Sequence, residues 1–103
     1  MSPELAQTLL RVHEALVERG AADAASQAYV VSYLENNEFD LALDAVLAGV
    51  SAPNAVTAAE RTALVVLAAS AGWPAGAPMT PAEYIERGLR FRKGTTDVFP
   101  HLT

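Results

Sequence analysis

The chain of 103 residues contains no cysteine, one lysine, one isoleucine and seven aromatic residues. Without cysteine there is no disulfide, no thiolate chemistry and no cysteine-ligated zinc or iron–sulfur site. The single lysine, Lys93, lies near an expected helix end, which is a poor place for a desolvated nucleophile. A chain poor in isoleucine and aromatics but rich in alanine, the best helix former, favours packed helices over a sheet.

Long apolar runs are also missing. The longest strongly apolar run covers residues 63–71, whereas a membrane span needs about 20 residues. The first ten residues lack the basic patch and apolar block of a signal peptide. We therefore expect a cytoplasmic protein with no membrane partner.

Positive charge is scarce in the first part of the chain. The net charge is −5, and residues 1–60 hold nine acidic residues against two basic ones. A negative surface repels nucleic acid and anionic membranes, so we expect no nucleic-acid partner. It attracts basic partners over a range that salt limits.

Apolar residues recur at spacings of three and four and are interrupted by Gly, Pro and Asn. This pattern predicts an all-α fold, a compact bundle of four or five short helices in one domain that spans residues 1–103. We expect helices from Pro3 to Gly20, from about Ala22 to Glu35, from a cap at Asn37 to Gly49, from Thr57 to Ala71, and from Thr80 to a point between Gly88 and Lys93.

Local signals define the starts and faces of these helices. Thr57 with Glu60 and Thr80 with Glu83 have the spacing of capping boxes, and Asn37 with Asp40 has a similar one. Residues 63–69 are apolar on every side, which indicates a central, buried helix. The core face of the third helix is expected to contain Phe39, Ala42, Leu43, Val46, Leu47 and Val50.

The residues that usually carry catalysis or bind metals form no recognisable motif. The two histidines, His13 and His101, lie at opposite ends of the chain and outside any ligand motif, so we predict no metal site. There is no G-x-S-x-G elbow around Ser70, no P-loop and no dinucleotide fingerprint, and we predict no catalytic residues and no cofactor. His13 is expected at the edge of the core. Trp73 is expected to cover the end of the bundle or to be an exposed aromatic anchor.

The most unusual stretch is residues 32–50, which carries four acids and no base. Carboxylates at Glu38 and Asp40 are stabilised by the positive end of the third helix, but this does not account for Glu35 or Asp44. Leu41 lies opposite the expected core face, so the helix is either buried on two sides or meets a partner. An apolar anchor with charges of one sign around it is typical of an electrostatically steered interface. We predict a partner-binding surface made of Tyr33, Glu35, Glu38, Asp40, Leu41 and Asp44.

Residues 29–73 resemble the Maf-type immunity proteins, small helical proteins encoded beside polymorphic bacterial toxins. The resemblance rests on Tyr33, on residues 38–44 with the letters EFDLALD, on residues 56–60 with the letters VTAAE, and on Gly72 with Trp73. At position 37 the family pattern has Gly where this chain has Asn37, a residue that also tolerates turn conformations. A tetratricopeptide turn has similar residues, but the chain has no 34-residue repeat.

The resemblance implies an immunity protein that binds a cognate toxin domain, expected to be basic, and neutralises it. An alternative is a non-enzymatic adaptor or structural module that pairs with itself as a homodimer or with a larger assembly. A small enzyme is a third alternative, and it would need a pocket with convergent titratable groups. We predict that the protein is not an enzyme.

Overall fold

The computed structural model describes residues 2–90, and this part of the chain is an all-α bundle, as the sequence predicts. Its only β-type pairing is an isolated bridge between Ala22 and Val50. None of its helices has the length and apolar character that a membrane crossing requires. The elements are α1 (Pro3–Glu18), α2 (Ser26–Glu35), α3 (Phe39–Gly49), a 3-10 turn η1 (Pro53–Ala55), α4 (Ala58–Ser70) and α5 (Pro81–Arg90).

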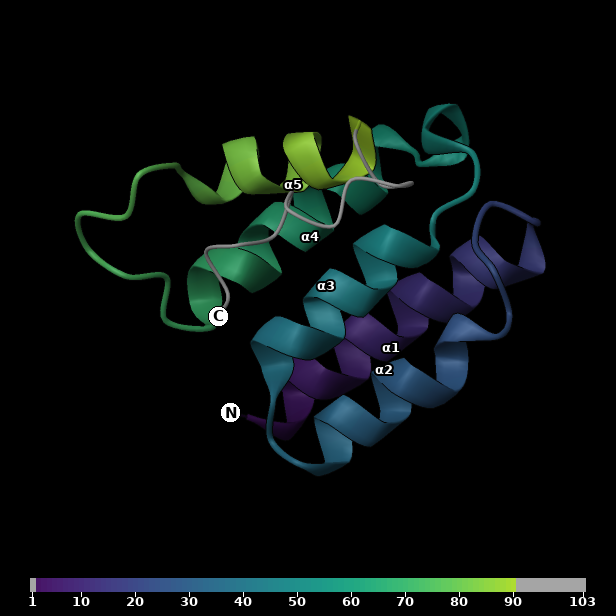
Figure 1. The fold of residues 1–103 in the computed structure, drawn as a ribbon, viewed down its shortest axis with the longest axis horizontal. Helices are drawn as coiled ribbons and strands as arrows, with labels where there is room; N and C mark the ends of the chain where they lie inside the picture. The colour runs from purple at the N-terminus through teal and green to yellow at the C-terminus, as the bar shows by residue number, and fades with distance from the viewer. Residues whose placement is uncertain (1, 91–103) are drawn as a thin grey trace.

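The helices form two groups that pack against each other (Figure 1). In the first group, α2 packs along α3, and α1 contacts both; in the second, α4 packs on α5. Contacts of α1 with α4 and of α3 with α5 join the two groups. The predicted core face of α3 is confirmed, because all six of its residues are buried. The largest other fully buried side chains are Leu9, His13, Leu16, Val30, Leu64, Tyr84, Ile85 and Leu89.

The two predicted capping boxes are confirmed. The Glu60 backbone N–H donates to Thr57 Oγ1 over 3.0 Å, while the Thr57 N–H donates to Glu60 Oε1 over 2.9 Å. Thr80 and Glu83 make the same reciprocal pair at the start of α5, at 2.8 and 3.1 Å. Each box satisfies two backbone donors at a helix start, so these starts follow from local sequence alone.

The second helix begins at Ser26, later than the predicted Ala22, because residues 21–23 pair with the end of α3. The Asp23 N–H donates to the Gly49 carbonyl over 2.8 Å, and the Ser51 N–H donates to the Ala21 carbonyl over 2.8 Å. The bridge between Ala22 and Val50 needs extended backbone at Ala22, and extended dihedral angles are incompatible with a helix there. This long-range pairing has no signal in the local sequence.

Asn37 ends α2 and does not cap α3 with its side chain, so the predicted role of this residue is wrong. Its backbone is left-handed, with φ of 60°. The Asn37 N–H bonds to the Leu34 carbonyl over 3.1 Å and the Glu38 N–H to the Tyr33 carbonyl over 2.8 Å, which is a Schellman motif. Glu38 becomes the N-cap of α3 without a side-chain hydrogen bond to the helix.

The prediction of a central α4 is also wrong. Leu64, Leu67 and Ala68 are buried, but Val66 on another side is 55% exposed. Val65 is half-buried against the core, but Ala58, Ala59 and Ala69 are exposed like Val66, so one face of α4 meets solvent. The alanine-rich composition hides which face is internal. Of the residues named above, Lys93 and His101 lie outside the described range.

Candidate functional site

Three carboxylates surround the turn between α2 and α3, and we call them the acidic edge: Glu35, Glu38 and Asp40. All three side chains are exposed. Within residues 2–90 none of them forms an ion pair or a side-chain hydrogen bond. By contrast, Arg19 pairs with Glu60 and Arg61 with Glu86, at 2.6 and 2.7 Å. The acidic edge is therefore uncompensated negative charge.

The geometry of the turn holds these carboxylates together. Asn37 in its left-handed conformation reverses the chain, so the last residue of α2 and the first turn of α3 lie close in space. The free backbone N–H groups at the start of α3 favour the carboxylates of Glu38 and Asp40. The sequence predicted that these acids lie near a helix start, and the structure places them there.

Two tyrosines on α2 lie one helical turn apart, just before the acidic edge. Tyr33, predicted as an anchor, is half-buried and packs against the core. Tyr29 is 64% exposed, the largest exposure among the big hydrophobic side chains of the described range. Tyrosines are enriched among residues that dominate binding energy. Tyr29 is not among the predicted anchors, although its spacing of four from Tyr33 on one helix indicates a shared face. Leu41, the second predicted anchor, is half-buried on α3.

Asp44 belongs to a different environment from the acidic edge. It is half-buried, and Tyr84 of α5 donates a hydrogen bond from its hydroxyl to Asp44 Oδ1 over 2.7 Å. Burial raises the pKa of Asp44 to about 7; the Tyr84 hydrogen bond opposes this and the charge of Asp40 adds to it. Burial, followed by the Asp44 charge, also raises the pKa of Tyr84. The sequence grouped Asp44 with the other acids of the predicted surface; its internal partner, Tyr84, is 40 residues away in the sequence and could not be predicted from this stretch.

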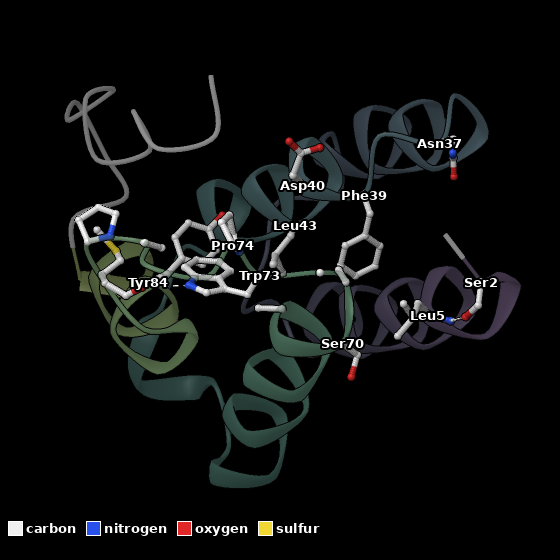
Figure 2. A pocket seen from close by; sticks show the side chains of 16 residues that line it. Ser2, Leu5, Asn37, Phe39, Asp40, Leu43, Ser70, Trp73, Pro74 and Tyr84 are labelled. Carbon is white, nitrogen blue, oxygen red and sulfur yellow. Dashed lines mark hydrogen bonds between the residues drawn. The ribbon is translucent and has the colours of Figure 1, made fainter.

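A hollow of about 1050 Å³ lies beside the acidic edge, and we refer to it as the hollow. It opens between the starts of α1 and α3, the end of α4, and the loop that leads to α5 (Figure 2). In Figure 2, Phe39 and Leu43 extend from α3 toward the side on which Trp73 lies. Its lining residues are mostly apolar and include Leu5, Phe39, Asp40, Leu43, Trp73, Met79 and Tyr84.

Trp73 forms one wall of the hollow. Its indole Nε1–H donates to the Met79 carbonyl over 2.9 Å, and its ring centroid is 5.4 Å from that of Tyr84. The half-buried ring thus covers Tyr84 at the end of the bundle, which is one of the two predicted roles. The tilted arrangement of the two rings is a favourable aromatic contact.

His13 is completely buried, which is deeper than the predicted edge of the core. Its Nδ1 is 2.8 Å from Gln27 Oε1 and its Nε2 is 2.7 Å from Ser26 Oγ. Burial lowers the pKa of this imidazole, which favours the neutral form. Both ring nitrogens are engaged with α2, so His13 joins two helices. The described range contains no group of three or more His, Asp or Glu residues placed to hold a metal ion.

Comparisons with protein-family models, with curated proteins and with solved structures find no match to this chain.

Proposed function

We propose that this protein binds a basic protein domain through the acidic edge and the adjoining tyrosines of α2. Following the resemblance to Maf-type immunity proteins, we further propose that the partner is a toxin domain that the protein neutralises. The observation that carries the proposal is the acidic edge: three exposed carboxylates at one turn with no positive partner within residues 2–90.

Charge and shape both support binding at this surface. Residues 2–90 contain eleven acidic residues and five arginines, so a positive partner is attracted at long range. Tyr29 offers a large, exposed aromatic surface one turn before Tyr33. Exposed aromatic anchors beside uncompensated charge combine contact energy with steering, which is the usual division of roles in specific interfaces.

The first experiment tests the partner. The domain encoded by the gene adjoining this one is expressed in a bacterial host, alone and together with this protein. We expect growth to stop with the domain alone and to recover with both, and we expect a purified complex. A harmless neighbouring domain, or one that does not bind, contradicts the immunity proposal.

The second experiment tests the surface. The double variant Glu35→Lys/Glu38→Lys should lower the association rate with that domain by about tenfold at low salt and flatten its salt dependence. The matched control is Glu14→Lys/Glu18→Lys, which changes the net charge equally at two exposed positions of α1. Equal loss of rate in both variants would show that total charge, and not the acidic edge, governs association.

A further inference from the structure

The hollow has an apolar floor. Phe39, Leu43 and Tyr84 line it and are 6%, 3% and 1% exposed, so they belong to the core while their surfaces border the hollow. Leu5, Trp73 and Met79 add apolar surface around them. A concave, mostly apolar space of this kind is the usual form of a binding pocket.

The polar atoms of the two large rings are already used within the protein. The Trp73 Nε1–H donates to the Met79 carbonyl and the Tyr84 hydroxyl donates to Asp44. Both hydrogen-bond donors are therefore occupied within the protein and do not point to a ligand in the hollow. The polar lining residues are Ser2, Asn37, Asp40 and Ser70. A ligand group that lies against Phe39, Leu43 and the two rings would lose its hydrogen bonds to water if it were polar, so this part of the hollow favours an apolar group.

The charge around the hollow is negative. Asp40 is the only charged residue among the described residues that line it. The starts of α1 and α3 also border the space, but Glu4 and Asp40 in their first turns offset the positive ends of these helices. The end of α4, whose carbonyls form the negative end of that helix, lines the opposite side. A chain entering the hollow is therefore favoured when its flanking residues are positive.

We propose that the hollow is the socket for an apolar side chain of the partner, presented by a short segment with lysine or arginine on both sides. Asp40 belongs to both the acidic edge and the lining of the hollow, so one basic segment can contact both. The positive charge of the partner is taken from the proposed function; the apolar anchor follows from the walls of the hollow.

The test uses short peptides as probes, with Trp73 as the reporter. Trp73 is the only tryptophan in the chain and lines the hollow, so its fluorescence reports occupancy. The capped peptide Lys-Lys-Phe-Lys-Lys should change the emission and bind about tenfold or more tightly than Lys-Lys-Gly-Lys-Lys or Glu-Glu-Phe-Glu-Glu. Equal binding of N-acetylphenylalaninamide would instead indicate a site for small neutral molecules and would overturn the inference, as would no binding at all.

Two variants in the loop after α4 test the location. Ala77→Phe places a ring at a lining position and should weaken Lys-Lys-Phe-Lys-Lys by about tenfold, while Ala75→Phe changes an exposed residue of the same loop that does not line the hollow and should leave binding unchanged. Circular dichroism checks that both fold. Equal affinities of the two variants would contradict the socket.

The same variants separate this inference from the proposed function. If the toxin domain binds the wild-type protein and Ala77→Phe equally, yet binds Glu35→Lys/Glu38→Lys poorly, the acidic edge is correct and the socket is wrong. If the toxin domain binds neither the wild-type protein nor the variants, while the peptide binds at the hollow, the socket stands and the proposed partner is wrong.

Discussion

Asp40 and Asp44 lie one helical turn apart on α3 but have opposite surroundings. Asp40 is exposed in the first turn, where backbone N–H groups favour its charge. Asp44 is half-buried against Tyr84, where burial raises its pKa to about 7. The same side chain thus supplies surface charge at one position and an internal helix-to-helix contact at the other. The difference comes from α5, because its Tyr84 contacts Asp44 while Asp40 is left exposed.

The largest expected effect comes from removing the donor to Asp44. Tyr84→Phe should lower the free energy of unfolding by about 2 kcal/mol at pH 8, because an ionised, half-buried carboxylate loses its hydrogen bond. At pH 4 the carboxyl is protonated and the loss should be smaller. Denaturant unfolding at both pH values measures this. Tyr33→Phe is the control. An equal loss of stability in this variant would mean that the hydrogen bond to Asp44 is not the cause of the loss.

Asp44→Asn should stabilise the protein by about 1 kcal/mol at pH 8, a value reduced for partial solvent exposure, and should have little effect at pH 4. The folded-state pKa of Asp44, about 7, lies above its ordinary value of 3.8. Its contribution to stability is therefore complete below pH 3.8 and is lost as pH rises through 7. Asn cannot ionise and still accepts from Tyr84, so it avoids that loss.

The difference in unfolding free energy between the wild-type protein and Asp44→Asn separates the effect of Asp44 from that of His13. The lowered pKa of His13 acts in the opposite direction, since its contribution is lost as pH falls below 6.5. Both proteins contain His13, so the effect cancels in the comparison. If the wild-type protein and Asp44→Asn have the same stability at every pH from 4 to 8, the Asp44 carboxyl is solvated and burial does not raise its pKa.

A smaller effect is expected in the turn that forms the acidic edge. Asn37→Ala should cost about 1 kcal/mol, because alanine tolerates the left-handed conformation poorly. Asn37→Gly should change stability by less than about 0.5 kcal/mol, since glycine adopts this conformation freely. Thermal unfolding of the two variants gives the comparison, and an equal effect of both would exclude backbone conformation as the cause.

The smallest effect is expected at Asp40. Asp40→Asn should change the free energy of unfolding by less than about 0.5 kcal/mol, as is usual for an exposed charge. It should also lower the pKa of Asp44 slightly, because the charge of Asp40 contributes to raising it. NMR titration of the Asp44 carboxyl measures the shift. A loss of several kcal/mol in the free energy of unfolding would show that Asp40, like Asp44, makes a specific contact within the protein.

Local patterns in the sequence predicted much of the fold. Thr57 with Glu60 and Thr80 with Glu83 define helix starts because each pair is complete within four residues. The core face of α3 followed from periodicity, since its apolar residues differ sharply from their neighbours. In α4 the periodicity carried no such contrast, and the exposure of Val66 was not predicted.

The candidate site was less predictable, because it depends on contacts between distant segments. The acidic edge was predicted from charge and a turn signal. The inward position of Asp44 depends on Tyr84, and the hollow depends on how the loop after α4 approaches α3. Residues 32–50 alone contain no signal for the contact with Tyr84 or for the approach of this loop. The exposure of Tyr29 was not predicted, because the residues around it on α2 show no clear contrast between an apolar and a polar face.

The backbone bridge between Ala22 and Val50 joins the two chain segments that flank the α2–α3 hairpin. Together with the Schellman turn at Asn37, it ties this hairpin at both ends. The two helices are therefore held in register, which fixes the spacing between Tyr29 and the acidic edge. A partner would thus meet a surface of fixed dimensions, and its affinity would depend little on rearrangement of this hairpin.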